Sequence, residues 1–217
     1  MGPASPSAGE TRILIPGAPW ELYEAFVRML PERSPIRSAF DGRNLEILVT
    51  GPLHGHFADL LDQFIKEVAG ELGIRYKPQG RTTWIRPEIE RGIEADNCYY
   101  MDPAKIATAL ALLSRRCNDV KHYPNPDFFM EVNISPPEAD RAAIYSAMGV
   151  AEVWSFDGQT LTIERLDEQG RYQPVAQSGF LHVRADQVPR WLLDEDLYDY
   201  GAWTRRVREW AGKELRG

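Results

Sequence analysis

The chain has 217 residues, a hydrophobic content of 43% and a net charge of −7. This length is enough for one domain with a sizeable core, and the negative charge argues against a surface that is basic throughout, although local basic patches remain compatible with it. The cysteines Cys98 and Cys117 lack the spacing of metal ligands, so we expect reduced thiols. We find no secretion signal and no apolar run long enough for a membrane span, and we predict a cytoplasmic protein.

The predicted elements begin after residues 1–12, which are small, polar and rich in proline and glycine and are expected to be disordered. Residues 13–217 are expected to form a single domain. A helix is predicted to start near Pro19, and a hairpin is predicted over 35–49 with its turn at Asp41-Gly42. An amphipathic helix over 54–72 follows and ends at Gly73.

The rest of the chain alternates between strand-like and helix-like segments. The expected elements are strands near 74–79 and 82–86, a polar loop over 87–94, a strand over 97–101, a helix over 103–114, a strand over 127–134, a helix over 138–148, strands over 151–156 and 160–165, and helical segments near 187–196 and 200–214. This alternation predicts an α/β or α+β domain in which helices flank a central mixed β-sheet.

Two acidic residues lie in segments that are otherwise apolar. Asp96 stands at the start of the strand over 97–101, and Glu131 lies within the strand over 127–134. Burying a carboxylate is costly unless a partner or a metal compensates, so the two acids are either a structural ion-pair set or a site for a divalent metal. The metal alternative suits phosphodiester hydrolysis, because Mg²⁺ prefers oxygen ligands and lowers the pKa of bound water. The backbone carbonyl of Val132 or Asn133 would then complete the ligand set.

Three groups of motifs run from about residue 36 to about residue 165. They are Leu45-Glu46-Ile47 with Gly51-Pro52-Leu53-His54; Gly80-Arg81-Thr82-Thr83 with Gly92-Ile93-Glu94-Ala95-Asp96-Asn97-Cys98-Tyr99-Tyr100; and Pro126-Asp127-Phe128-Phe129-Met130-Glu131-Val132-Asn133-Ile134-Ser135 with Asp140-Arg141, Ile144-Tyr145, Gly149-Val150-Ala151-Glu152-Val153-Trp154 and Asp157-Gly158. Together they resemble the Uma-type endonuclease family of the restriction-endonuclease-like PD-(D/E)xK nuclease superfamily.

The resemblance implies a restriction-endonuclease-like fold and the hydrolysis of DNA with Mg²⁺, for which Mn²⁺ would substitute. Asp96 matches the aspartate of the PD motif, with Ala95 where proline is usual, and Glu131 matches the acid of (D/E)xK. Asn133 stands at the lysine position, which departs from the pattern because that lysine orients the attacking water and offsets charge. Similar sequences often carry a basic residue on the following helix, and Arg141 occupies that position here.

Two further residues match positions near the site in similar sequences. Glu46 would be a third ligand or would hold a water, and His54 would lie close by. Each has an ordinary alternative, since Glu46 would otherwise be a solvated strand acid, and His54 and Arg141 would be surface residues near helix starts. The absence of the lysine also leaves a second function open, that of a nuclease-like scaffold that binds nucleic acid or protein without cutting it.

A homodimer is expected because two sites related by a two-fold axis cut both DNA strands most easily. The C-terminal part of the chain is rich in aromatic and apolar residues, which would either cover a neighbouring subunit or pack on their own core. These residues are Trp191, Leu197, Tyr198, Tyr200, Trp203 and Trp210.

Overall fold

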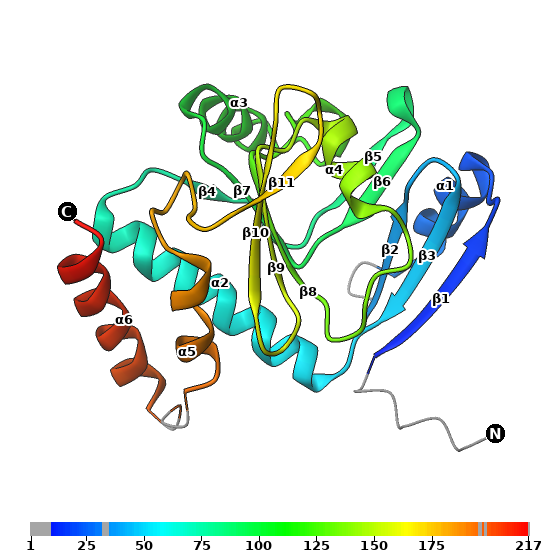
Figure 1. Ribbon diagram of the computed structural model, residues 1–217. Helices are drawn as coiled ribbons and strands as arrows, with labels where there is room; N and C mark the ends of the chain where they lie inside the picture. The colour runs from blue at the N-terminus through cyan, green and yellow to red at the C-terminus, as the bar shows by residue number, and fades with distance from the viewer. Residues whose placement is uncertain (1–9, 32–34, 195–196, 198, 217) are drawn as a thin grey trace, which may run out of the picture.

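The computed structural model of the chain describes residues 10–31, 35–194, 197 and 199–216. Within these ranges the chain forms two β-sheets with helices packed around them, which confirms the predicted α+β class (Figure 1). The strands divide between two sheets, whereas the sequence pattern predicted one central sheet. No helix in this part of the chain is long and apolar enough to cross a membrane.

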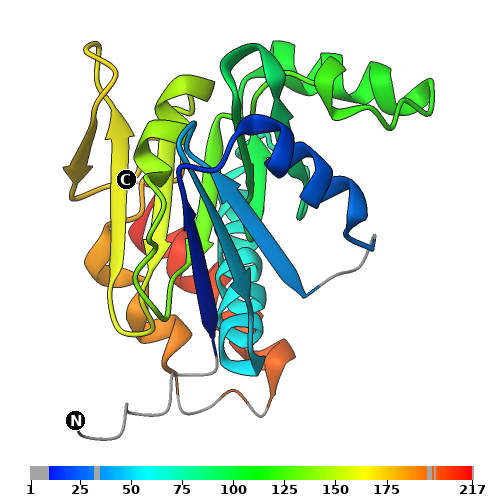
Figure 2. The same ribbon diagram turned by 90° about the vertical axis from the view of Figure 1, so that its right-hand side faces the viewer.

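The first sheet is antiparallel and has the strand order β1-β3-β2-β6-β5. Its strands are β1 (Thr11–Pro16), β2 (Ile36–Phe40), β3 (Asn44–Val49), β5 (Thr83–Arg86) and β6 (Arg91–Glu94). Figure 2 shows β1, in dark blue, at the edge of this sheet. The prediction of a loop over 87–94 is wrong for β6, because this short strand obtains its backbone hydrogen bonds from two neighbouring strands despite its weak apolar pattern.

The second sheet is mixed and has the order β11-β10-β9-β8-β7-β4. Its strands are β4 (Lys77–Pro78), β7 (Asn97–Tyr100), β8 (Phe128–Val132), β9 (Glu152–Phe156), β10 (Leu161–Leu166) and β11 (Tyr172–Val175). All five residues of β8 are buried, as in a strand that is covered on both faces. β8 runs parallel to β9 and antiparallel to β7.

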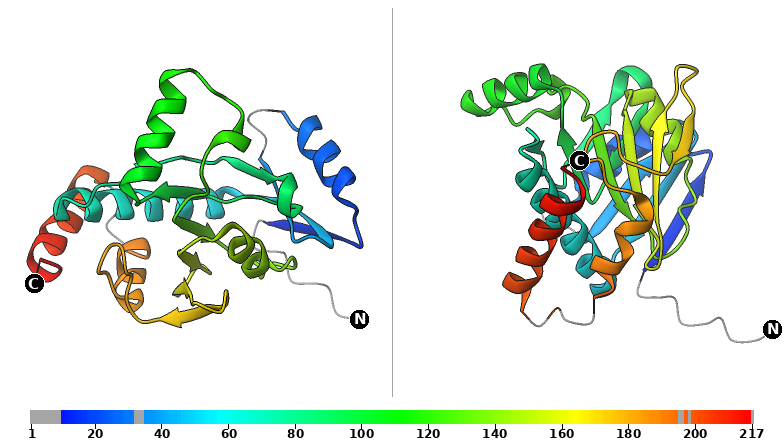
Figure 3. Two further views of the ribbon diagram at one scale, coloured as in Figure 1. Left: turned by 90° about the horizontal axis from the view of Figure 1, so that it is seen from above. Right: turned by 60° about the vertical axis from the view of Figure 1, so that its left-hand side comes forward.

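Helices pack against both sheets. They are α1 (Trp20–Met29), α2 (Pro52–Leu72), α3 (Pro103–Ser114), α4 (Arg141–Met148), α5 (Pro189–Leu192) and α6 (Tyr200–Glu214). Of these, α1 packs against β2 of the first sheet. The apolar stripe of α2 packs against Met130 and Val132 of β8, and α6 lies beside α2 (Figures 1 and 3). Phe129 packs on the opposite side of β8, in the cluster that includes Tyr145 of α4. Glu131 alternates with Met130 and Val132, so its side chain points to the α4 side.

Residues 10–12 belong to the folded domain, although their composition grouped them with the expected disordered N-terminus. Glu10 is 3% exposed, and β1 pairs with β3 from Thr11 opposite Val49 onward. Residues 1–9 of that expected segment lie outside the described part of the chain. The side chains of Glu10 and Arg12 are buried because the fold supplies partners of opposite charge, which composition does not reveal.

Candidate active site

Asp96 lies where the chain passes from one sheet to the other, between the end of β6 at Glu94 and the start of β7 at Asn97. In the β7–β8 pairing, Asn97 is opposite Met130, so the next step of the register sets Asp96 opposite Glu131. Side chains that face each other on neighbouring strands share one side of a sheet. Asp96 and Glu131 are 4% and 2% exposed, so two buried acids occupy opposite positions in this register.

Donors from three different elements contact the Asp96 carboxylate. Its Oδ1 atom is 2.8 Å from Nη2 of Arg37 on β2 and 2.7 Å from Nε2 of His54 near the start of α2. Its Oδ2 atom accepts a hydrogen bond of 2.7 Å from the backbone N–H of Val132. Burial alone would raise the pKa of Asp96, but His54 and Arg37 lower it below its usual value. Asp96 is therefore held as a carboxylate.

Glu131 is less well compensated than Asp96. Its Oε2 atom accepts a hydrogen bond of 2.6 Å from Nη1 of Arg141, and the Tyr145 hydroxyl donates to Oε1. Burial raises the pKa of Glu131 above its usual value, Arg141 opposes this effect, and the charge of Asp96 adds to it. The sequence analysis named Tyr145 only within a motif and did not include it in the site. Tyr145 lies one helical turn after Arg141, and this spacing was the available signal that both side chains contact the same residue, Glu131.

Arg141 links Glu131 to Glu46. Its Nη2 atom donates to Oε1 of Glu46 at 2.8 Å, and the two carboxylates raise the pKa of Arg141 against the lowering effect of burial. The helix that carries Arg141 was predicted to begin at residue 138, but α4 begins at Arg141. Asp140 caps it by accepting a hydrogen bond of 2.9 Å from the backbone N–H of Ala143.

Glu46, on β3, anchors the turn that precedes α4. It is 1% exposed, so it is not a solvated strand acid. Its Oε2 atom accepts hydrogen bonds from the backbone N–H groups of Glu138, at 2.5 Å, and Ala139, at 3.1 Å. Burial alone would raise the pKa of Glu46, but Arg141 and these hydrogen bonds lower it.

His54 bridges two carboxylates. Its Nδ1 atom is 2.5 Å from Oε1 of Glu10, and its Nε2 atom faces Asp96. Burial alone would lower the pKa of His54, but the hydrogen bonds to Asp96 and Glu10 raise it. An ionised carboxylate only accepts hydrogen bonds, so two such partners favour the doubly protonated imidazolium. The side chain is buried rather than at the surface.

Glu10 and Arg12, at the start of the described chain, join the cluster to Ser135 and Asn133. Oε2 of Glu10 accepts hydrogen bonds from the backbone N–H and the hydroxyl of Ser135, at 2.9 and 2.6 Å. Arg12 donates to Glu46 at 2.8 Å and to Oδ1 of Asn133 at 3.2 Å. The sequence analysis did not include Glu10, Arg12 or Arg37 in the site. Glu10 and Arg12 lie two residues apart on one strand face, which was the only local signal for them.

Two cavities reach the edge of this cluster. One, of about 210 Å³, is lined by Glu131, Asn133, Arg141 and Tyr145 among others. The second, of about 520 Å³, lies along the segment from Asn133 to Pro137 and the β9–β10 hairpin. Asn133 and Pro137 line both cavities, so the Asn133 side of the cluster is the side that a ligand can approach.

The carboxylate oxygens of the cluster are the groups that could bind a divalent cation. The described residues contain no group of three or more His, Cys, Asp or Glu side chains arranged to hold a metal ion. Mg²⁺, however, is commonly held by one or two carboxylates and completes its shell with waters and substrate oxygens. Each oxygen of Glu131 accepts one of the two hydrogen bonds named above, so lone pairs remain. The pair Asp96 and Glu131 fits such a site. The contact that involves Val132 is made by its N–H group.

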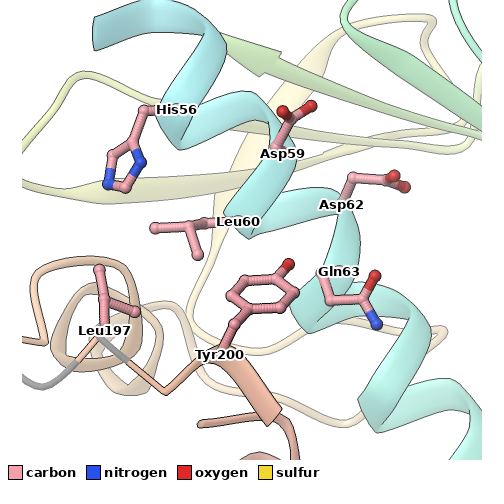
Figure 4. Close-up of a pocket in the computed structure, with 7 residues that line it drawn as sticks. All are labelled: His56, Asp59, Leu60, Asp62, Gln63, Leu197 and Tyr200. Carbon is pink, nitrogen blue, oxygen red and sulfur yellow. The ribbon is translucent and has the colours of Figure 1, made fainter.

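A separate cavity of about 590 Å³ lies between α2 and the beginning of α6 (Figure 4). His56, Asp59 and Tyr200 line it, and their side chains gather around one space in the close-up. None of the predicted site residues lines this cavity, so it is distinct from the cluster of buried acids.

The sequence model of one protein family matches most of the chain. The family is Uma2, described as "Putative restriction endonuclease", and the match covers residues 23–192. Comparison with curated proteins gives no match. The matched segment contains Glu46, His54, Asp96, Glu131 and Arg141, and it begins after Glu10 and Arg12.

Proposed function

Because the chain belongs to the Uma2 restriction endonuclease family, we propose that it is an endonuclease that hydrolyses phosphodiester bonds of DNA with a divalent metal ion. The observation that carries the proposal is that two acids, Asp96 and Glu131, are buried at opposite positions of the register that continues from β7 and β8. Glu131 retains a raised pKa despite its arginine partner, which marks a place where further positive charge is favourable.

Mg²⁺, with Mn²⁺ as a substitute, would be held by Asp96, Glu131 and the carbonyl of Val132, and when bound it neutralises phosphate charge and lowers the pKa of a bound water. The protein's own residues prepare this place. Arg37 and His54 hold Asp96 in its ionised form and in one orientation. Rigid carboxylates reduce the reorganisation that the reaction requires.

The opposite side of the cluster positions Glu131. The Tyr145 hydroxyl and one end of the Arg141 guanidinium hold its two oxygens, and Glu46 holds the other end of that guanidinium. Glu46 in turn accepts hydrogen bonds from backbone N–H groups, so the carboxylate that holds Arg141 is itself held in one position. Arg141 would thus serve as the basic residue on the following helix, and it would face a phosphate that enters beside Glu131.

A second function is favoured by a specific observation. Arg141 makes ion pairs with both Glu46 and Glu131, so much of the acid charge is neutralised by protein side chains. Asn133 contributes no charge where the nuclease pattern has lysine. A nuclease-like scaffold that binds nucleic acid or protein without cutting it is consistent with both facts.

DNA cleavage decides between these functions. Purified protein with Mg²⁺ or Mn²⁺ should nick or cut plasmid DNA, and Glu131→Ala should abolish this activity. The fold should survive, because Arg141 keeps its pair with Glu46. Glu168→Ala, at an exposed acid, is the matched control and should cleave like the wild type.

Metal binding is tested separately by calorimetry. Mn²⁺ should bind to the wild type, and the binding should vanish in Asp96→Ala. If several metals and forms of DNA give no cleavage above the Glu131→Ala background, the endonuclease proposal fails and the scaffold function takes its place.

A further inference from the structure

Arg12 is a part of the site that lies outside the segment matched by the family, which begins at residue 23. It is carried by the edge strand β1, whose pairing sets Leu14 opposite Glu46. Arg12 precedes Leu14 by two residues and so shares its face, diagonally across from Glu46. The Arg12 side chain is only 4% exposed, which shows that its charge is used inside the protein and not on the surface.

The guanidinium of Arg12 differs from that of Arg141 in its hydrogen-bond partners. Its Nη1 atom donates to Glu46 at 2.8 Å, but Nη2 donates to the neutral Asn133 side chain at 3.2 Å and Nε donates to the neutral Ser135 hydroxyl at 2.8 Å. The nearest oxygen of Glu10 is 3.6 Å from Nη2. By contrast, both Nη atoms of Arg141 donate to carboxylates.

This difference determines which cation can receive an anionic ligand at least cost. A phosphate oxygen could replace a neutral amide or hydroxyl acceptor and strengthen the hydrogen bond, because charge-assisted bonds are about twice as strong as neutral ones. At Arg141 both Nη atoms already donate to carboxylates, and only the buried Nε atom has no hydrogen-bond partner among the described residues. Asn133 also lines the two cavities beside the cluster, so the neutral side of Arg12 is the side nearest to an entering ligand.

The position of Asn133 gives this contact a chemical meaning. Asn133 stands two residues after Glu131, where the nuclease pattern has its lysine, and Arg12 brings a guanidinium to 3.2 Å from the Asn133 side chain. We propose that Arg12, on the N-terminal strand, binds the phosphodiester group of the DNA substrate and adds to the charge of Arg141 the positive charge that Asn133 lacks. The proposal rests on the endonuclease function and adds to it a phosphate-binding residue from outside the matched segment.

The test uses the full-length protein and three variants of this position. Arg12→Gln removes the positive charge and keeps hydrogen-bonding groups, whereas Arg12→Lys keeps a positive charge. The double variant Arg12→Gln/Asn133→Lys places a positive charge at residue 133 instead, directly after β8. Arg43→Gln, at an exposed arginine of the β2–β3 turn, is the control. For each protein one measures plasmid cleavage with Mn²⁺, binding of a short DNA duplex with Ca²⁺ at several salt concentrations, and the thermal unfolding midpoint.

Arg12→Gln should slow cleavage by about 100-fold, as expected for the loss of one donor to developing phosphate charge. It should also reduce the slope of log affinity against log salt concentration by about one, because one phosphate contact is lost. The Asn133→Lys change in the double variant should recover at least about tenfold of the cleavage rate, and Arg12→Lys should retain the salt slope. Arg43→Gln should behave like the wild type.

The outcomes separate this proposal from the endonuclease function. If the wild type cleaves DNA and Arg12→Gln cleaves equally well, the Arg12 proposal fails and the endonuclease function stands. If the wild type binds DNA without cutting it and Arg12→Gln loses one unit of salt slope, the endonuclease function fails and the phosphate contact stands. If Arg12→Gln lowers the unfolding midpoint, and Asn133→Lys restores the midpoint but neither cleavage nor salt slope, Arg12 has a structural role only and the proposal is overturned.

Discussion

At the scale of single residues, the cluster holds charges that rarely share one interior. Four carboxylates face three guanidinium groups and one histidine among the described residues. The acids are Glu10, Glu46, Asp96 and Glu131, and the bases are Arg12, Arg37, His54 and Arg141. Removing one partner from a buried ion pair costs about 3–5 kcal/mol, because the other charge remains buried without compensation. Stability and activity are therefore coupled at these positions.

Arg141→Ala should lower both the free energy of unfolding and the rate of DNA cleavage. Glu46 and Glu131 would lose their shared cation, and we expect a loss of about 3–5 kcal/mol. The stability of Arg141→Lys should lie between those of the wild type and Arg141→Ala, since an ammonium group keeps the charge but does not reproduce the planar guanidinium of arginine. It should retain or raise activity if the lysine's role has passed to this position. Urea unfolding and plasmid cleavage measure the two effects.

Arg171→Ala provides the comparison for Arg141→Ala. The Arg171 side chain is 70% exposed and lies 3.7 Å from Asp167. An exposed pair contributes about 0–1 kcal/mol, so this variant should remain close to the wild type. Equal stability and equal cleavage in Arg141→Ala and wild type would contradict a role for Arg141 in the cluster.

Glu10 should make the protein sensitive to acid. Burial alone would raise its pKa, but hydrogen bonds from His54 and Ser135 lower the pKa of Glu10 from 4.5 to about 2. Its contribution to stability is therefore complete above about pH 4.5 and is lost as the pH falls towards 2, with a size of about 3 kcal/mol. Glu10→Gln should be less stable at neutral pH, and its unfolding free energy should depend less on pH in this window. Urea unfolding at a series of pH values tests this, and parallel curves for the two proteins would contradict it.

At the scale of elements, two glycines differ in the space that surrounds them, one in a helix and one in a strand. Gly70 lies inside α2, where an added Cβ would meet no atom within 4 Å. Gly92 lies in β6, where an added Cβ would come 2.2 Å from the hydroxyl oxygen of Tyr23. Tyr23 is fully buried, so it has no free space to move into. β6 thus keeps its place in the first sheet because this residue has no side chain.

Gly92→Ala should destabilise the protein by about 1–3 kcal/mol, the usual effect of overpacking a core. Gly70→Ala should stabilise it by about 0.5–1 kcal/mol, because alanine loses less backbone entropy in a helix interior. Thermal or urea unfolding of both variants measures the contrast. A Gly92→Ala protein as stable as Gly70→Ala would show that Tyr23 does not hold this position.

At the scale of the whole molecule, most of the C-terminal aromatic residues pack within their own subunit. Trp203 is fully buried and donates a hydrogen bond of 3.0 Å to the backbone carbonyl of Trp191. The ring of Trp210 lies near those of Phe64 and Trp191. Tyr200 is 44% exposed, and Tyr198 lies outside the described residues. These residues therefore join α6 to α2 and give little support to an interface with a neighbour.

The homodimer remains a prediction that rests on the geometry of double-strand cleavage. Light scattering at micromolar concentration should give the mass of two chains, and linear plasmid should appear early in the reaction together with nicked plasmid. A monomer mass, with nicked plasmid accumulating before any linear product, would show that single chains cut one strand at a time.

Elements whose signals are local could be predicted from the amino-acid sequence alone. The apolar stripe and Gly73 predicted α2, which ends where Gly73 adopts a φ of 68°, and the hairpin at Asp41-Gly42 was predicted equally well. The strand pattern also identified Asp96 and Glu131, because a charged residue within an apolar segment is conspicuous without any knowledge of its neighbours. Local spacing is enough in each of these cases, since the interacting residues are close in sequence.

The division of the chain into two sheets, and the residues that surround Asp96 and Glu131, became apparent only in the folded chain. Glu10 lies just before β1, Arg12 and Arg37 lie near the starts of β1 and β2, and Arg12 contacts Ser135 across 123 positions of the chain. Such residues are buried because distant partners of opposite charge neutralise them, and the free energy of that arrangement depends on all partners together. A polar side chain in the sequence is the same whether it meets water or another charge, so only the folded chain distinguishes the two.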